Sequence, residues 1–228
     1  MKSVKQSVGE RFPGFADFLL NCKFLLFPDK SQFGESEILS ELVVSHKLEN
    51  YLEIGCSNPV AWSNSYSLRK FGLNGISIDA NMDLSLQWKI FRPRDTFIQA
   101  GVVPFGTKNE LKFYKFPRRH SVLNTFSETE ARKWSRGMGC NPTEIIVHQL
   151  SILDVFSIAE AKFGHVDLLL LDIEGFDVKI IPDVLNLKQP PRVILVEDKN
   201  FEVTKALEGT RYRCLKSFNG QSVFELTN

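Results

Sequence analysis

The sequence predicts an α/β protein built on a mostly parallel β-sheet. Strand-like apolar runs alternate with segments of helical periodicity over most of the 228 residues. Two of these runs, 166–171 and 190–197, are apolar at most positions, as expected of central strands covered on both faces. Near the C-terminus, Asn219-Gly220 joins two β-rich runs, and this dipeptide is a strong signal for a hairpin. We therefore expect the sheet to finish with one antiparallel strand.

The N-terminal part is expected to be helical. The run GFADFLLNCKFLLF (14–27) is rich in Phe and Leu, and we expect a helix packed on the body of the protein. Covering a substrate cleft or pairing with another subunit are the alternatives for this segment. A second helix is expected over 36–46, with Ser36 as its N-cap. Residues 1–48 are thus expected to form a helical segment and 49–228 one globular domain.

Strands and helices then follow each other in regular order. The expected strands are 51–55, 75–79, 96–102, 111–116, 143–150, 166–171, 190–197 and the two arms of the hairpin over 211–228. The expected helices are 62–72, 83–91, 128–135 and 152–164, with a loop over 118–125. This order is typical of a doubly wound sheet.

Composition and charge exclude several classes of protein. Lys and Arg number 28 and Asp and Glu 27, so the chain lacks the basic excess of a nucleic-acid-binding protein. No apolar run approaches the roughly 18 residues of a membrane span, and the start lacks the apolar region of a signal peptide. The four cysteines are far apart and form no CxxC pair. We therefore expect reduced thiols in a cytoplasmic protein.

Two residues at strand ends predict a ligand site. In such sheets, ligands bind beyond the carboxyl ends of the strands. Gly55 follows the first predicted strand, and Asp79 ends the second, 24 positions later (79 − 55). An acid at about 20 positions meets ribose hydroxyls in nucleotide-binding sheets. The alternative is a simple turn glycine and a solvated strand end.

The loop after Gly55 indicates which ligand. Its sequence, GCSNPVAW, lacks the further glycines that pack against a pyrophosphate. A cofactor without phosphates fits better, and S-adenosylmethionine combines a ribose and an adenine with an amino-acid tail. Asn58, Ser63 and Asn64 offer hydrogen bonds to the carboxylate and ammonium of that tail.

The same stretch resembles the FkbM-type S-adenosylmethionine methyltransferases, in particular their shorter subgroup. The resemblance rests on YLEIGCSNPVAWSNSYSLRKFGLNGISIDAN (51–81), SVLNTFSETEARKW (121–134), VDLLLLDIEGFD (166–177) and VILVE (193–197), in that order. The departures from the family pattern are Glu53 for Asp, Cys56 for Ala and Ser65 for Thr. They affect the fit of the loop more than the identity of the cofactor.

The resemblance implies a Rossmann-like, seven-stranded sheet of the class I methyltransferase architecture, with 49–228 as the methyltransferase domain. It further implies an S-adenosylmethionine-dependent O-methyltransferase that acts on a hydroxyl group of a sugar, a glycan or a related natural product. The residues expected to bind the cofactor are Glu53, Gly55, Cys56, Asn58, Ser63, Asn64, Asp79, Ala80, Asn81, Ala100, Gly101 and Asp172.

The catalytic candidates lie after the apolar strand 166–171. Asp172 leaves this strand at the ligand edge, and Glu174 lies two residues further on. A carboxylate there can take the proton of an acceptor hydroxyl, or it can cap the following helix. Asp172, with Glu197 and Asp198, could instead hold a divalent ion such as Mg²⁺ or Mn²⁺. The sequence leaves both roles of Asp172, general base and metal ligand, as alternatives.

His120 is a second catalytic candidate, because a neutral imidazole can accept a hydroxyl proton. A surface histidine is the alternative. Arg118, Arg119, Arg92 and Arg94 could meet an anionic group of the substrate, or form a solvated charge cluster.

Two other functions compete with methyl transfer. An NAD-dependent oxidoreductase can use a similar sheet, although the missing phosphate glycines disfavour it. A non-catalytic binding module with this fold is the second alternative. The expected partner is a small-molecule or glycan acceptor, and the Phe-rich N-terminus leaves a homodimer open.

Overall fold

The computed structural model describes residues 15–27, 31–32, 34–173 and 176–227. The chain divides into two compact units, Met1–Gln99 and Ala100–Asn228, and each is described by itself. This division falls inside the region predicted as one domain, so the boundaries 1–48 and 49–228 stay a prediction. Within the described residues, no helix is long and apolar enough to cross a membrane.

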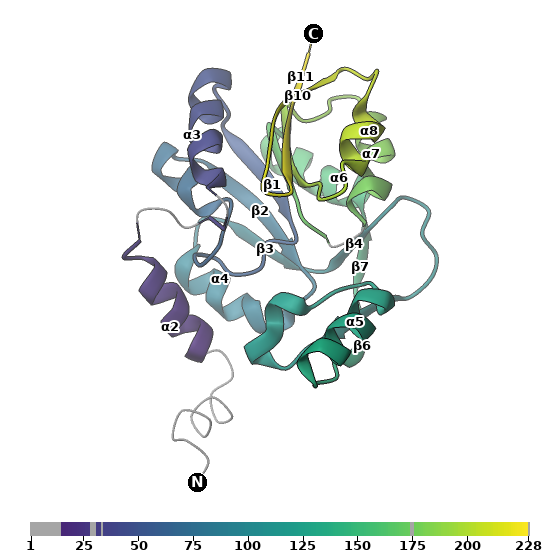
Figure 1. Cartoon of the computed structure of the whole chain (residues 1–228). Coiled ribbons are helices and arrows are strands. Elements are labelled where there is room, and N and C mark those ends of the chain that lie inside the picture. Colours follow the sequence, from purple (N-terminus) through teal and green to yellow (C-terminus); the bar gives the residue numbers. More distant parts are fainter. Residues whose placement is uncertain (1–14, 28–30, 33, 174–175, 228) are drawn as a thin grey trace. The chain divides into compact units, whose positions relative to one another are not determined.

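The first unit holds three parallel strands with helices around them (Figure 1). Strand β2 pairs in parallel with β1 on one side and with β3 on the other. The described elements are α2 (Phe15–Phe24), α3 (Glu35–His46), β1 (Asn50–Ile54), η1 (Tyr66–Phe71), β2 (Asn74–Asp79), η2 (Met82–Leu84), α4 (Ser85–Phe91) and β3 (Thr96–Gln99). All residues of β1 are buried, including the polar Asn50 and the acidic Glu53.

The second unit contains the remaining strands. Its described elements are β4 (Gly101–Val103), β5 (Leu111–Lys115), η3 (Arg118–Leu123), α5 (Glu128–Met138), β6 (Thr143–Val147), β7 (Gln149–Ser151), α6 (Ile152–Phe163), β8 (Leu168–Leu171), α7 (Asp177–Leu185), β9 (Val193–Glu197), α8 (Glu202–Leu207), β10 (Tyr212–Phe218) and β11 (Gln221–Leu226). Strands β4 and β7 form a small parallel sheet, and β5 and β6 a small antiparallel one.

The C-terminal strands follow a characteristic order. β8 pairs in parallel with β9, while β11 runs antiparallel to both β9 and β10. The last strand of the chain is therefore inserted between two earlier ones. Asn219 and Gly220 have φ values of 48° and 79°, which is the left-handed pair that a two-residue hairpin turn requires.

Apart from the small sheets β4–β7 and β5–β6, the pairs β1–β2 and β2–β3 of the first unit and β8–β9 of the second are parallel, and the two pairs of β11 are antiparallel. The predicted α/β class with a mostly parallel sheet is confirmed.

Helix α6 shows how sequence signals set an element's bounds. Ser151 accepts the N–H group of Asp154, whose carboxylate accepts the N–H group of Ser151, so both donors are satisfied in a capping box. Gly164, with φ 79°, ends the helix. The buried positions are Ile152, Val155, Phe156 and Ala159, which lie on one helical face.

Several expected elements differ from the structure. The helix predicted over 62–72 is a 3₁₀ helix that begins at Tyr66, because serines at its start bond to nearby backbone and side chains. The N-cap of α3 is Gly34, with φ 89°, and not Ser36. The expected loop over 118–125 contains the short 3₁₀ helix η3.

Two predicted strands are each split between two sheets. The run 96–102 divides into β3 and β4, and 143–150 divides into β6 and β7. Each run leaves one sheet and enters the other near the same hydrogen bond. In this bond, the N–H group of Gly101 donates to the carbonyl oxygen of His148 at 2.8 Å. A Cβ atom at Gly101 would lie 2.3 Å from Leu111, so this crossing needs a glycine.

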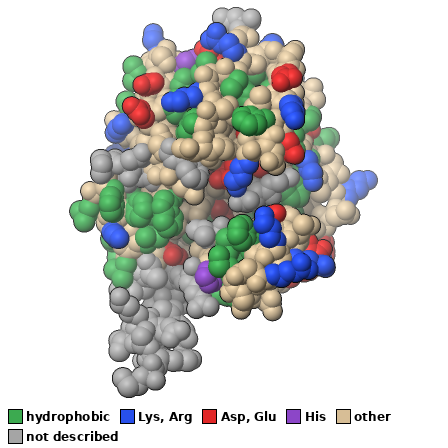
Figure 2. Space-filling view, in the orientation of Figure 1, with side chains coloured by type: hydrophobic (Ala, Val, Ile, Leu, Met, Phe, Trp, Pro, Cys, Tyr) green, Lys and Arg blue, Asp and Glu red, His purple; other side chains and the backbone are tan. Residues whose placement is uncertain are grey.

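Helix α2 carries both half-buried and exposed apolar residues. The Phe18 ring lies 5.4 Å from that of Phe91, at the end of α4. Hydrophobic side chains also gather on the surface over α2 (Figure 2). The large exposed apolar residues of α2 and the turn after it are Leu19, Leu25, Leu26 and Phe27.

Candidate functional site

The ends of β1 and β2 lie next to each other in the first unit. Because the two strands are parallel and in register, the chain leaves β1 at Gly55 beside the end of β2 at Asp79. Gly55 has φ 82°, a conformation that costs glycine no steric penalty. The N–H groups of Gly55 and Cys56 donate to the carbonyl oxygen of Ile78, at 2.8 and 3.2 Å. This turn starts the β1 loop, residues 55–65.

Asp79 is half-buried and its carboxylate bonds to the β1 loop. Oδ2 accepts the N–H group of Ser57 at 2.9 Å, and Oδ1 accepts that of Asn81 at 2.8 Å. Burial raises the pKa of Asp79, while the N–H donors of Asn81 and Ser57 oppose the rise by stabilising the carboxylate. A carboxylate has about four acceptor positions, so acceptors remain for two ligand hydroxyls. The ribose-binding role of Asp79 stays a prediction, and these acceptors fit it.

Two residues of the β1 loop adopt backbone conformations that are uncommon outside glycine. φ is 46° at Ser57 and 58° at Trp62, and each such residue costs about 1–3 kcal/mol. Surrounding contacts hold Ser57 in place, because Asp79 binds its N–H group and Trp88 donates Nε1–H to its carbonyl oxygen at 2.9 Å. Trp88 in turn packs in a buried cluster with Cys56.

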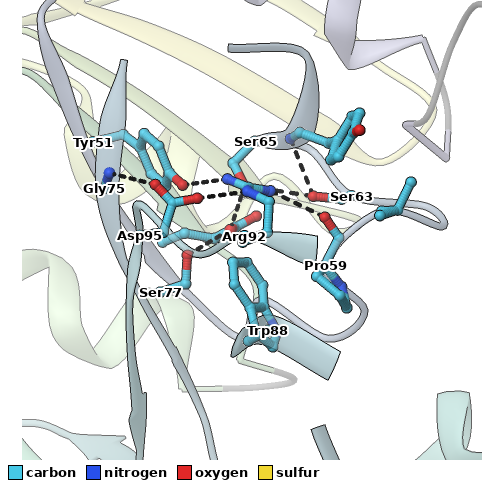
Figure 3. A network of polar contacts seen from close by, with 12 residues as sticks. Tyr51, Pro59, Ser63, Ser65, Gly75, Ser77, Trp88, Arg92 and Asp95 are labelled. Atoms are coloured by element: carbon cyan, nitrogen blue, oxygen red, sulfur yellow. Dashed lines mark hydrogen bonds and ion pairs between the residues drawn. The ribbon is translucent and has the colours of Figure 1, made fainter. Parts of the chain in front are cut away.

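Arg92, the residue after α4, is buried inside the first unit and only 1% exposed. Its Nε donates to Asp95 at 2.5 Å, and its Nη1 donates to the carbonyl oxygen of Pro59 at 3.1 Å. Its Nη2 donates to Ser65 Oγ at 3.2 Å and to the hydroxyl of Tyr51 (Figure 3). Both expectations for Arg92, a substrate contact and a solvated charge, are wrong, because the side chain is buried and its guanidinium N–H groups donate to groups of the protein itself.

Asp95 extends the network to β2. Its Oδ1 accepts the N–H group of Gly75 at 2.9 Å, and its side chain is only 2% exposed. The guanidinium of Arg92 also lies near two aromatic rings, 4.9 Å from the centroid of Trp88 and 5.6 Å from that of Tyr66. One buried cation thus connects two strands, the β1 loop and η1.

Glu53, on β1, supports the β1 loop from the same network. Its Oε2 accepts hydrogen bonds from Ser65 Oγ at 2.6 Å and from Ser77 Oγ at 3.2 Å. A hydroxyl has one hydrogen and two lone pairs. Ser65 can therefore donate to Glu53 while it accepts from Arg92. The buried carboxylate faces these serines, and its predicted contact with a cofactor stays a prediction.

The charge of this network changes near neutral pH. Burial raises the pKa of Glu53 to about 7, although the Arg92 guanidinium and the hydroxyl donors of Ser65 and Ser77 lower it. With Glu53 ionised, two carboxylates share one guanidinium in the interior. With Glu53 protonated, Arg92 and Asp95 remain as a balanced pair.

Several residues shortly after β1 have buried polar atoms that lack a hydrogen-bond partner. The Oδ1 atoms of Asn58 and Asn64 and the Oγ atom of Ser67 are buried and lack a hydrogen-bond partner among the described residues. Asn58 is only 7% exposed. An orphaned buried polar atom costs about 1–3 kcal/mol, so native proteins supply a ligand or an ordered water there. These side chains fit the predicted hydrogen bonds to the amino-acid tail of a cofactor.

The other predicted cofactor residues of this unit have structural contacts. Ser63 Oγ accepts the N–H group of Tyr66 at 3.2 Å, and Asn81 caps η2. Ala80 is buried, and burial raises the pKa of the Cys56 thiol well above its usual value, so Cys56 stays protonated. Contact of these residues with a cofactor stays a prediction.

In the second unit, Asp172 follows β8, whose four leucines are buried. Asp172 is half-buried, and Glu174 lies outside the described residues. The N-cap of α7 is Phe176, which makes no side-chain cap, and the capping alternative for Asp172 stays a prediction. The carboxylate of Asp177 accepts the N–H group of Ile173 at 3.0 Å.

The other two metal candidates have partners within the protein. Glu197 pairs with Lys199 at 2.5 Å. Asp198 Oδ1 accepts the N–H group of Val203 at 2.9 Å, and Oδ2 accepts the N–H group of Thr204 at 3.1 Å, as a cap for α8. Among the described residues, no group of three or more His, Cys, Asp or Glu could hold a metal ion. The metal role stays a prediction.

His120 lies in η3, is half-buried, and donates its backbone N–H group to Pro117 at 2.7 Å. Ala100 and Gly101 are buried at the start of the second unit, where Gly101 belongs to β4. The catalytic role of His120, and the cofactor roles of Ala100 and Gly101, stay predictions.

The second unit also has an open cavity of about 380 Å³ beside α5. It is lined by Tyr114, Arg132, Arg136, Asn141 and Glu144, among others. Most of these residues belong to the 104–142 segment. The lining combines an aromatic ring with charged and amide groups, a composition that suits polar small molecules.

Sequence reasoning missed the residues that hold the β1 loop. Asn21 in α2, Asp95 after α4 and Ser77 in β2 are buried and bonded to the loop or its network. Ser77 could have been found from the sequence, because it lies two residues before Asp79 on a predicted strand, and side chains two residues apart face the same side of the sheet. Asn21 and Asp95 could not be found in this way, since their partners are far away in the sequence.

Comparison with known proteins gives a limited result. No family model matches the chain. No curated protein matches it either. One solved structure similar to this chain is described as a "putative caffeoyl-CoA O-methyltransferase from Staphylococcus aureus". The match has a TM-score of 0.46 and 10% identity, and it covers 85% of this chain and 82% of that one. The FkbM resemblance stays a resemblance, and we base the proposal below on the residues of this chain.

Proposed function

We propose that this protein is an S-adenosylmethionine-dependent O-methyltransferase whose acceptor is a hydroxyl group of a sugar, a glycan or a related natural product. The donor site is the β1 loop together with the carboxylate of Asp79. The acceptor class comes from the family resemblance.

The main support for the proposal is that most backbone N–H groups of the β1 loop already donate hydrogen bonds within the protein. A pyrophosphate is bound at this position of a sheet by free N–H groups of a glycine-rich loop. Here six loop N–H groups already donate within the protein, namely those of Gly55, Cys56, Ser57, Val60, Ala61 and Ser63. Pro59 has no N–H group. A donor without phosphates fits such a loop, and a dinucleotide does not.

The polar side chains of the loop fit the two ends of S-adenosylmethionine. Asp79 has acceptors left for the two ribose hydroxyls. The orphaned Oδ1 atoms of Asn58 and Asn64 are acceptors, so they fit the ammonium group of the tail. When bound, the cofactor supplies a methyl group on a sulfonium sulfur. The residues of the loop orient it, and orientation is a large part of the rate of an in-line displacement.

Asp172 is the proposed general base. An alcohol must lose its proton during methyl transfer, and a carboxylate at the end of a buried strand can accept it. A metal held by Asp172, Glu197 and Asp198 is less well supported, because Glu197 and Asp198 already bond to Lys199 and to α8. Activity that survives exhaustive chelation would support the base.

Calorimetric titration with S-adenosylmethionine tests the donor, with NAD⁺ as the matched control. We expect saturable heat with S-adenosylmethionine and none with NAD⁺. The opposite pattern would favour the oxidoreductase, and no heat with either would refute the proposed donor site.

A second experiment separates an enzyme from a binding module. The protein and S-adenosylmethionine are incubated with a panel of sugar-containing acceptors, and mass spectrometry follows the gain of one methyl group. Asp172→Asn should still bind the donor in calorimetry and lose transfer. Transfer at the wild-type rate in this variant would exclude Asp172 as the base.

A further inference from the structure

Helix α2 contacts the β1 loop through one fully buried side chain. Asn21 has no exposed surface, and its Oδ1 accepts two backbone N–H groups, from Val60 at 3.2 Å and from Ala61 at 3.0 Å. The partners are about 40 residues away in the sequence. Val60 and Ala61 are themselves buried. Without Asn21, both N–H groups would be left without a partner inside the protein.

Two aromatic contacts accompany this carboxamide on the same helix. The ring of Phe18 lies 5.4 Å from that of Phe91, and the ring of Phe24 meets that of Trp62 edge-on at 5.3 Å. Phe18, Asn21 and Phe24 are spaced by three residues, so they lie on neighbouring positions of one helix surface. The helix therefore contacts the loop through Asn21 and Phe24, and it contacts the end of α4 through Phe18.

The loop segment that α2 contacts is strained. Trp62 has φ 58°, a left-handed conformation that a bulky residue rarely adopts. Such a conformation persists only where surrounding contacts determine it. The contacts here are the two hydrogen bonds of Asn21 just before Trp62 and the Phe24 ring against its indole. This segment lies between Asn58 and Asn64, the two orphaned carboxamides of the proposed donor site.

We propose that Asn21 is a positioning residue, and that α2 is a clasp that fixes the β1 loop in its donor-binding conformation. This inference rests on the proposed function, since it assigns α2 to the donor site. In the absence of Asn21, the Val60–Trp62 segment can rearrange to hydrate its N–H groups, and Asn58 and Asn64, which flank this segment, lose their fixed positions.

The experiment compares three variants of the full chain. Asn21→Ala removes the acceptor, Asn21→Asp keeps an oxygen at that position, and Leu19→Ala changes α2 at a position that is 51% exposed. Val223→Ala, in the core of β11, serves as a control for general destabilisation. Each variant is measured by thermal unfolding, by amide hydrogen exchange without ligand, and by titration with S-adenosylmethionine.

For Asn21→Ala we expect the amides of Val60 and Ala61 to exchange at least about tenfold faster and the Kd for the donor to rise at least about tenfold. Leu19→Ala should resemble wild type in both measurements. Val223→Ala should lower the unfolding midpoint while it leaves these two amides protected relative to the rest of the chain. Asn21→Asp should restore part of the protection.

Unchanged exchange of Val60 and Ala61 in Asn21→Ala would overturn the clasp. Faster exchange with an unchanged Kd would also overturn it, because the clasp would then not serve the donor. If wild type binds no donor, the proposed function fails, and the hydrogen exchange alone decides whether Asn21 fixes the loop.

Discussion

Arg92 and Asp95 form an ion pair inside the first unit, with Nε and Oδ2 2.5 Å apart and 0% and 2% of the two side chains exposed. Arg132 and Glu128, on the surface of α5, are also 2.5 Å apart, but their side chains are 72% and 57% exposed. The two pairs have the same N–O distance and differ in burial. Their comparison therefore tests how burial changes the contribution of an ion pair to stability.

We expect Arg92→Met to lower the free energy of unfolding by about 3–5 kcal/mol, because it leaves the Asp95 carboxylate buried without its cation. Adding Asp95→Asn should cost less than the sum of the single changes, with a coupling of at least about 1 kcal/mol. Urea unfolding of the four proteins measures this cycle. Arg132→Met should cost less than about 1 kcal/mol. Equal losses at the two arginines would contradict the role of burial.

Glu53 should make stability depend on pH. Its pKa is raised by burial from 4.5 to about 7 in the folded protein. Between these values the unfolded chain has released this proton and the folded protein keeps it, so stability falls as pH rises through this window. The loss approaches about 3 kcal/mol above pH 7. We expect Glu53→Gln to remove most of this dependence in urea unfolding between pH 4.5 and 8, whereas Glu144→Gln, on the surface, leaves it intact. A wild-type slope in Glu53→Gln would contradict the assignment.

Asp79 should determine the affinity for the methyl donor. Asp79→Asn keeps one acceptor oxygen and replaces the other by a donor, so a ribose diol loses an acceptor and gains a mismatched group. We expect the Kd for S-adenosylmethionine to rise at least about tenfold, which corresponds to about 1.4 kcal/mol. Glu41→Gln, on the exposed side of α3, is the matched control and should bind normally in the same calorimetric titration. An unchanged Kd for Asp79→Asn would place the ribose elsewhere.

Gly75 and Gly137 should respond to alanine in opposite ways. A Cβ atom at Gly75 would lie 2.1 Å from Cζ of Tyr51, and the Tyr51 hydroxyl is bonded to Arg92, so the ring cannot move aside freely. We expect Gly75→Ala to lower the free energy of unfolding by about 1–3 kcal/mol. Nothing lies within 4 Å of a Cβ atom at Gly137, in α5. Gly137→Ala should therefore raise stability by up to about 1 kcal/mol, as thermal unfolding can show.

The ends of several strands could be located from the sequence, because a buried strand is visible as a short run rich in apolar residues. The runs that become β1, β2, β8 and β9 are short and rich in apolar residues, so the residues at their ends, among them Gly55 and Asp79, could be placed at the edge of the sheet where ligands bind. The split runs 96–102 and 143–150 could not be resolved in this way. Alternation predicts a strand, but it does not say which strand will be the partner.

The support of the site could not be predicted, for a related reason. A lone Arg92 in a charged segment is more often solvated than buried. It becomes buried here because Asp95, Tyr51, Ser65 and the carbonyl oxygen of Pro59 all meet it. Asn21 is similar, since its partners belong to a loop about 40 residues away.

The sequence by itself determined the α/β class, most of the strands and the residues that follow β1 and β2, but not the helices α7 and α8. Hydrophobic periodicity and turn residues act over short stretches of chain, which is why these features could be predicted. Only the tertiary structure decided which polar side chains are buried and which backbone N–H groups are occupied. A buried polar group is tolerated only where distant partners converge on it, and that convergence is a property of the folded chain.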